Sequence, residues 1–115
     1  MSDSVEHPKV FCPEAFAVFN PEKMGKTTLF ESDRILVGLN SFEPGQEHKL
    51  HAHEGMDKVY QVLEGQGQFL LEGSEMSMEP GSMLIAPSGV PHGIRNDGAG
   101  RLVVLAILAP GPGKK

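Results

Sequence analysis

Glycine and proline divide this chain into short segments. The sequence of 115 residues contains 14 glycines and 9 prolines, and few uninterrupted windows are long enough for a typical helix. Because both residues disfavour helix interiors and are typical of turns, their spacing indicates short strands joined by tight turns. We therefore predict an all-β domain, with room for a short helical turn only in residues 11–26.

The segments between the turns have the composition of strands. The first, residues 34–42, is rich in branched and aromatic side chains and stops at the turn 43–45. Residues 58–63 and 67–72 flank the turn 64–66 and are predicted to pair as a β-hairpin. Further short strands are expected at 50–53, 75–78, 82–86, 92–95 and 101–108. Strands at this spacing favour a sandwich or a closed barrel.

Charge and hydropathy exclude several classes of partner. The formal net charge of −5 disfavours the basic surface that binds phosphates, so we expect no nucleic-acid partner. No run of apolar residues is long enough to span a bilayer, and the first residues lack the pattern of a secretory signal, so we expect a soluble, cytoplasmic protein without membrane contact. Cys12 is the only cysteine, which agrees with a reducing compartment.

Histidines supply the candidate chemistry. His51 and His53 lie two residues apart on a predicted strand, so both side chains project to the same face. Neutral imidazole is a common ligand of zinc, iron, nickel, copper and manganese. Taken alone, this pair is weak evidence for a metal, because two solvated or packed histidines would have the same spacing.

Two spaced motifs make the interpretation more specific. The first consists of Gly45, five residues, His51-x-His53 and, after the next strand, Gly65. The second consists of Gly81, five residues, Pro87-x-Gly89, two residues, His92, three residues and Asn96. In order and spacing they resemble the two motifs of the small single-domain cupins, and the resemblance spans residues 34–109. It implies a double-stranded β-helix, or jelly-roll barrel, in which His51, His53 and His92 bind one divalent metal ion, either Fe, Mn, Ni, Cu or Zn.

The sequence departs from the family at one ligand. The first cupin motif usually supplies a glutamate where this chain has Lys58, and a protonated amine cannot bind a cation. Asp57 could replace that carboxylate if the loop before it has slipped, although strand alternation directs it to the other face. Further candidates, each weaker because residues beside turns are usually solvated, are Glu47, His48 and Glu54.

Lys58 itself has two interpretations. Inside the barrel it could hold the carboxylate or enolate of a substrate, and at the barrel mouth it would pair with a protein carboxylate. We prefer the second, because lysines are seldom left unpaired in an interior. Tyr60 shares the face of Lys58 and is expected to be a wall residue, whereas Arg95 is expected on the surface. No catalytic residue can be assigned.

The resemblance implies a small metalloenzyme of the dioxygenase, isomerase or decarboxylase type that acts on a small organic compound. The alternative is a non-catalytic module that binds a small ligand or a metal. We expect one domain, in which residues 1–33 are an N-terminal arm with edge strands, 34–109 the barrel and 110–115 a flexible tail. Because residues 102–108 are wholly apolar, a homodimer is expected.

Overall fold

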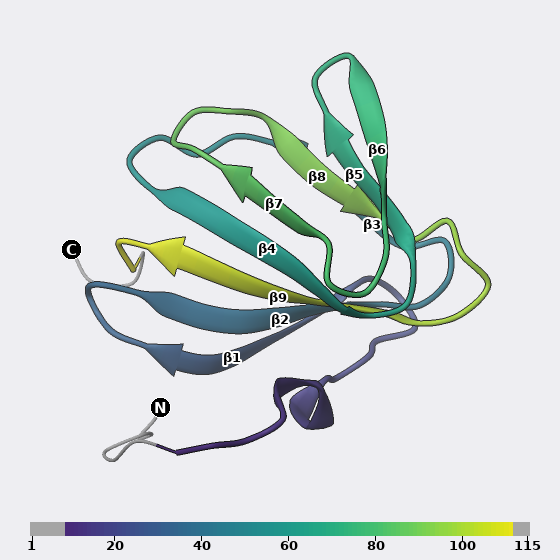
Figure 1. The fold of residues 1–115 in the computed structure, drawn as a ribbon, viewed down its shortest axis with the longest axis horizontal. Coiled ribbons are helices and arrows are strands. Elements are labelled where there is room, and N and C mark those ends of the chain that lie inside the picture. Colours follow the sequence, from purple (N-terminus) through teal and green to yellow (C-terminus); the bar gives the residue numbers. More distant parts are fainter. Residues whose placement is uncertain (1–8, 112–115) are drawn as a thin grey trace.

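The computed structural model describes residues 9–111, which form nine strands and one turn of 3-10 helix (Figure 1). The helical turn is η1 (Pro13–Phe16), within the window that the sequence left for it. The strands are β1 (Gly25–Glu31), β2 (Leu36–Phe42), β3 (Glu47–His51), β4 (Asp57–Glu64), β5 (Gly67–Leu71), β6 (Ser74–Met78), β7 (Met83–Ala86), β8 (His92–Arg95) and β9 (Leu102–Ala109). The all-β class is therefore confirmed. The predicted flexible tail lies outside the described residues from position 112 onward.

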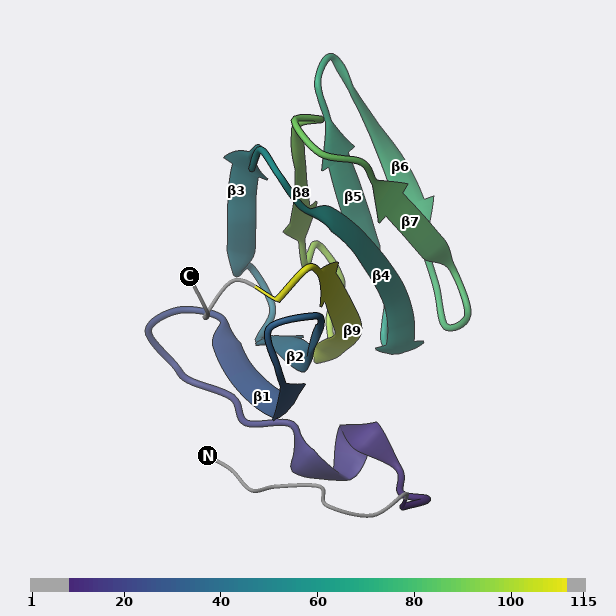
Figure 2. The same cartoon turned by 90° about the vertical axis from the view of Figure 1, so that its left-hand side faces the viewer.

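The strands form two antiparallel sheets that face each other (Figure 2). The larger sheet has the strand order β1-β2-β9-β4-β7, and the smaller has the order β3-β8-β5-β6. Strands that follow each other in the sequence thus alternate between the sheets over much of the chain. This is the arrangement of a double-stranded β-helix, and the predicted jelly roll is confirmed. Among residues 9–111 there is no helix of the length and hydrophobicity that crossing a bilayer requires.

The predicted hairpin around residues 64–66 is wrong. β4 pairs with β7 and β9, whereas β5 pairs with β6 and β8, so the turn carries the chain from one sheet to the other. The reason is that each strand has one apolar face to bury. Facing each other across two layers, Tyr60 of β4 and Phe69 of β5 pack in the same core, with ring centroids 6.4 Å apart. The hairpin instead joins β5 to β6.

The hydrophobic core lies between the two sheets. Inward-facing residues of both sheets contribute to it: Phe42, Tyr60, Val62, Phe69, Met78, Ile94, Leu102, Val104 and Ala106. In β9, the predicted burial on both faces holds only in part, because Val103 on the outer face is buried whereas Leu105 and Ile107 remain half-exposed. Tyr60 and Ala106 of this core also line a cavity at one end of the barrel.

Candidate functional site

A cavity of about 290 Å³ lies at the end of the barrel where β4 begins and β9 ends, which faces the viewer in Figure 2. Two lysines and three histidines line it: Lys26, Lys58, His48, His51 and His53. The other polar residues in its lining are Thr27, Thr28, Asn40 and Tyr60. Backbone and apolar side chains of β1, β2 and β9 form much of the remaining wall. Among the described residues that line this cavity there is no aspartate or glutamate.

His51 and His92 face each other across the pair of strands β3 and β8, with ring centroids 4.3 Å apart. Nδ1 of His51 donates to the carbonyl oxygen of Lys49 at 2.7 Å, and Nδ1 of His92 donates to that of Val90 at 2.9 Å. Because a carbonyl only accepts, each Nδ1 carries the proton, and Nε2 of each neutral ring carries a lone pair. Nε2 of His92 is buried and has no hydrogen-bond partner within residues 9–111.

The third predicted ligand, His53, lies two residues beyond the end of β3, is exposed and lines the cavity. Its ring centroid is 5.3 Å from that of His51, so both of the other predicted ligands neighbour His51. The structure therefore brings His51, His53 and His92 into one cluster. As the side chains stand, however, no three histidine, cysteine, aspartate or glutamate residues within 9–111 have the arrangement that would hold a metal ion.

Lys58 accounts for part of that misfit. Lys58 is only 4% exposed, and its Nζ donates a hydrogen bond to Nε2 of His51 at 3.2 Å. A metal bound by His51 would need this same nitrogen atom. Burial, and then the positive charge of Lys26, lower the pKa of Lys58. Our preferred expectation, an ion pair with a carboxylate at the mouth, is wrong because strand alternation places Lys58 inside the barrel beside Tyr60.

His48 is a cavity residue that sequence reasoning ranked low. It precedes His51 by three positions, so strict alternation would place the two on opposite faces. The register of β3 against β8 shifts between these residues. His48 pairs with Ile94 and His51 with His92, so three steps along β3 match two steps along β8. This extra residue turns both rings inward, where they stack with centroids 4.1 Å apart. Burial, and then the electrostatic effect of the neighbouring His51, lower the pKa of His48 to about 3.

The remaining candidates lie outside the cavity. Asp57 is exposed, and its Oδ1 accepts a hydrogen bond from the backbone nitrogen of Ser88 at 2.9 Å, as alternation away from Lys58 predicts. The other two acidic candidates, Glu47 and Glu54, are exposed and do not line the cavity. Arg95 binds Glu75 on the surface of the smaller sheet, with Nη1 donating to Oε2 at 3.0 Å.

The electrostatics of the cavity favour neutral rings. Burial lowers the pKa of His51 and of His92, and the charge of Lys58 lowers the pKa of His53, so each imidazole is biased toward the neutral form that can donate a lone pair. Burial also raises the pKa of Tyr60 to about 12, which keeps its hydroxyl protonated at neutral pH. Tyr60 is thus a wall residue whose ring centroid lies 5.6 Å from that of His92.

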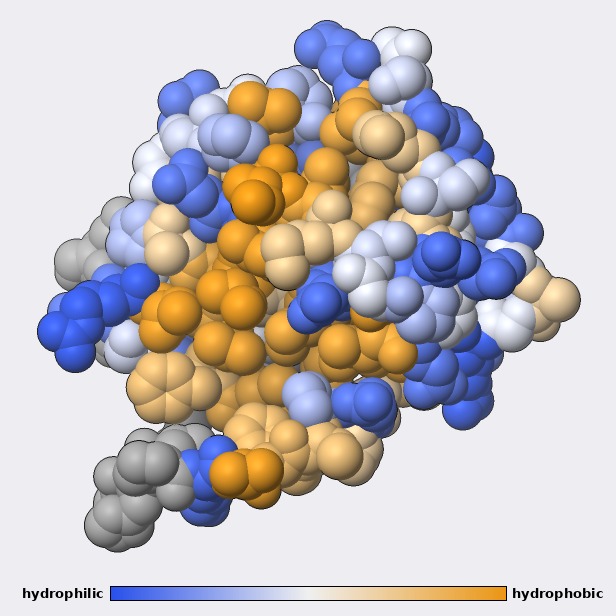
Figure 3. All heavy atoms as spheres, viewed as in Figure 1, coloured by the Kyte–Doolittle hydropathy of each residue, from blue (hydrophilic) through white to orange (hydrophobic). Residues whose placement is uncertain are grey.

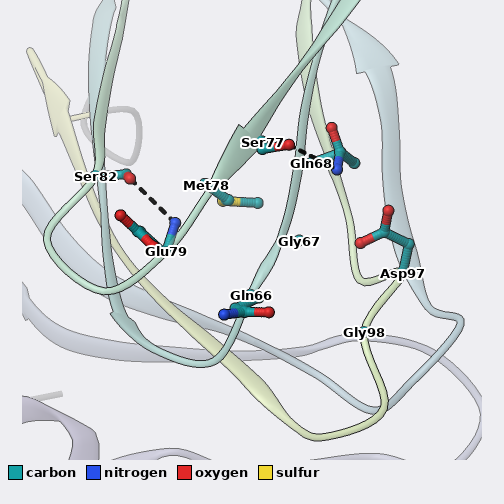
Figure 4. Close-up of a pocket in the computed structure, with 9 residues that line it drawn as sticks. All are labelled: Gln66, Gly67, Gln68, Ser77, Met78, Glu79, Ser82, Asp97 and Gly98. Atoms are coloured by element: carbon teal, nitrogen blue, oxygen red, sulfur yellow. Dashed lines mark hydrogen bonds between the residues drawn. The ribbon is translucent and has the colours of Figure 1, made fainter.

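A second cavity lies at the opposite end of the barrel (Figure 4). It measures about 440 Å³ and is lined by amide, hydroxyl and acidic side chains, among them Gln68 and Asp97. Its hydrogen bonds are local, such as the one from Gln68 Nε2 to Ser77 Oγ at 3.3 Å. No histidine or lysine is among the described residues that line it, so the smaller, histidine-lined cavity is the better candidate site despite its size.

Comparison with known proteins agrees with this architecture. Residues 38–108 match the family model of the cupin domain. The chain is 35% identical over 85 residues to an oxalate-binding protein of Thermotoga maritima, a match that covers 74% of this chain and 69% of the relative. Among solved structures, TT1209 of Thermus thermophilus is 42% identical, with a TM-score of 0.84 over 90% of this chain and 98% of that one.

A further solved structure, a predicted oxalate decarboxylase of Thermotoga maritima, is 27% identical. Its TM-score is 0.72, and the match covers 76% of this chain and 80% of that one. The family model spans more than half of the sequence, and it includes both histidine motifs and eight of the nine described strands in whole or in part. This chain therefore belongs to the cupin family.

Proposed function

We propose that this cupin binds a small organic ligand in the histidine-lined cavity, together with a divalent metal ion held by His51, His53 and His92. The observation that carries the proposal is the buried Nε2 of His92, which has a lone pair and no partner within residues 9–111. A buried polar atom without a partner costs roughly 1–3 kcal/mol, and a metal ion would satisfy it. The backbone bonds at Nδ1 of His51 and His92 orient the rings as supporting carbonyls do at metal sites.

The donor set fits a metal in its chemistry, although one contact must change. Nζ of Lys58 would have to leave Nε2 of His51, and its flexible stem permits that movement. Three neutral imidazoles suit Fe, Mn, Ni, Cu or Zn, and nothing in the set distinguishes these ions. When bound, the metal would act as a Lewis acid that fixes and polarises an oxygen of the ligand.

The relatives supply the ligand to test first. The protein from Thermotoga maritima with 35% identity is named for oxalate binding, and a solved structure of that organism is described as a predicted oxalate decarboxylase. A cavity of about 290 Å³ is large enough for a small organic acid of that kind. We therefore choose oxalate as the reference ligand for this chain.

Binding is preferred to catalysis because the described lining residues include no carboxylate that could serve as a general acid or base. The pKa of Tyr60 is raised to about 12. The second candidate is a metalloenzyme of the dioxygenase, isomerase or decarboxylase type, since three protein ligands would leave metal positions open to a substrate. We further propose a cytoplasmic location and a homodimer.

The metal assignment predicts the composition of the protein. After dialysis against Mn²⁺ or Zn²⁺ and removal of excess ion, plasma emission analysis should find about one ion per chain. The substitutions His51→Ala and His92→Ala should each remove it, whereas Asp57→Ala should not, because that carboxylate bonds to Ser88 outside the cavity. The assignment would be contradicted if the parent protein and the three variants had equal metal content. It would also be contradicted if only Asp57→Ala lost the metal.

The substitution Lys58→Glu tests the same assignment by an expected increase in metal affinity. This change removes the ammonium that occupies Nε2 of His51 and restores the carboxylate typical of the family motif. Metal affinity should rise at least about 10-fold, the scale on which supporting groups at metal sites act. Competition with a fluorescent chelator measures the affinity, and an unchanged value would show that the histidines do not bind a metal next to residue 58.

A further inference from the structure

Lys58 is a buried cation without a protein anion. It is 4% exposed, and its hydrogen bond within residues 9–111 goes to an imidazole, not to a carboxylate. Neither of the ion pairs formed by the described residues involves it, since these join Arg95 to Glu75 and Arg101 to Glu43. An ammonium removed from water without a counter-charge is costly, so a buried lysine of this kind is normally paired.

A second lysine and a histidine share the same cavity. Lys26 of β1 also lines it, with β2 and β9 between β1 and β4 in the larger sheet, and it is close enough to lower the pKa of both Lys58 and His48. His48 adds an Nδ1 that is buried and without a hydrogen-bond partner within residues 9–111. The cavity thus concentrates positive charge and unused polar atoms, and the described lining residues provide no negative charge.

We propose that Lys58 and Lys26 form a carboxylate-binding site that works without a metal. The ligand class is a small organic carboxylate, one of whose oxygens accepts a hydrogen bond from Nζ of Lys58 in place of Nε2 of His51. Such an anion supplies the missing counter-charge and favours the ammonium over the neutral amine. The inference rests on the proposed use of this cavity for ligand binding, but it does not depend on the metal.

The test compares carboxylates with uncharged analogues of nearly the same shape. Protein is stripped of metal with EDTA, which is then removed, and is titrated at constant ionic strength with sodium oxalate and sodium acetate, and separately with oxamide and acetamide. Amide chemical shifts from ¹⁵N NMR report both the affinity and the location of binding. We expect at least one of the two carboxylates to bind, with shifts at Lys58 and His48, and neither amide to do so.

Variants assign the charge to individual lysines. Lys58→Met keeps the length of the side chain and should weaken carboxylate binding about 10-fold or more, the value of a hydrogen bond to an ionised group. Lys26→Met should weaken it by a smaller factor. Lys23→Met removes the same charge from an exposed position outside the cavity and should leave the affinity nearly unchanged. If Lys58→Met does not fold, Lys26→Met and the amide analogues still decide the question.

The outcomes separate this inference from the metal assignment. Carboxylate binding by metal-free protein that fails in Lys58→Met supports the lysine site, even if no metal ever binds. Three outcomes would overturn it: no binding by metal-free protein, equal binding of the amides, or equal affinity in the Lys58→Met and Lys23→Met variants. Binding that appears only after a metal is added would support the metal site and contradict the lysine site.

Discussion

The chemistry of the site depends on one position, at which a positively charged side chain replaces a negatively charged one. Where the cupin motif usually has a glutamate, this chain has Lys58, and the same strand position carries it into the barrel. The ammonium then donates a hydrogen bond to Nε2 of His51, the atom at which we propose metal binding. One residue thereby makes the interior of the barrel more positive and places a cation in competition with a metal. It also makes anions more favourable ligands for the same cavity.

At the same scale, His48 predicts a loss of stability in acid for the metal-free protein. Its pKa falls from 6.5 to about 3 in the folded state, so between these values the unfolded chain binds more protons than the folded one. The free energy of unfolding should therefore decrease as the pH falls below 6.5, by up to about 1.4 kcal/mol per pH unit from this group. Urea unfolding of the parent protein and of His48→Gln at pH 7.5 and 5.0 measures how much of this decrease in the free energy of unfolding comes from His48. The same pH dependence in both proteins would contradict the prediction.

At the scale of elements, turns that cross between the sheets shape the barrel. The turn after β4 leads to β5 in the opposite sheet, and it passes close to the chain just before β9. Gly65 stands in this turn with a φ of +89°, and a Cβ there would lie 2.1 Å from the carbonyl oxygen of Arg101. Both the left-handed backbone and the close approach therefore require glycine.

Gly65→Ala should consequently destabilise the fold far more than Gly81→Ala. The two glycines have similar backbone angles, with φ values of +89° and +95°, but a Cβ at Gly81 would have no neighbour within 4 Å. Gly81→Ala should cost about 1–2 kcal/mol, the usual penalty of the left-handed region. Gly65→Ala should cost at least about 2 kcal/mol more, because backbone atoms must also move. Urea unfolding measures both losses, and equal values would mean that the approach to Arg101 is not rigid.

At the scale of the molecule, the outer face of the larger sheet is apolar (Figure 3). Met83 and Ile85 of β7 are 55% and 62% exposed, and Leu105 and Ile107 of β9 are half-buried nearby in the same sheet. A continuous apolar surface of this kind is unusual for a monomer. The homodimer that the sequence predicts would cover this face with the same face of a second copy.

Ile85→Lys should therefore convert the dimer to a monomer. A charge buried within an apolar interface loses its hydration without gaining a partner, which raises the dimer dissociation constant by at least about 10-fold. Met76→Lys is the matched control, because Met76 is 56% exposed but lies on β6 in the other sheet. Sedimentation velocity at micromolar concentrations measures the mass. A parent protein that sediments as a monomer, or a dimer that survives Ile85→Lys, would refute this interface.

Local patterns were sufficient for the features that depend only on neighbours in the sequence. Glycine and proline marked the turns, and branched residues marked most of the strands, so the all-β class could be predicted. The two-residue period of a strand separated Asp57 from Lys58, and His51 and His53 both line the cavity, although the predicted strand 50–53 ends at His51. The spacing of the histidine motifs identified the family. Each of these features is set by backbone geometry over a few residues, which is why the sequence alone determined it.

Pairing and packing between distant segments decided the rest. Only the tertiary structure assigned β4 and β5 to different sheets, because a turn residue marks where the chain reverses but not which strand it joins. Only the one-residue shift between β3 and β8 turned His48 into the cavity. The contact of Lys58 with His51 likewise depends on how two strands from opposite sheets approach each other. These outcomes follow from the burial of apolar faces by the whole chain, and no local pattern records them.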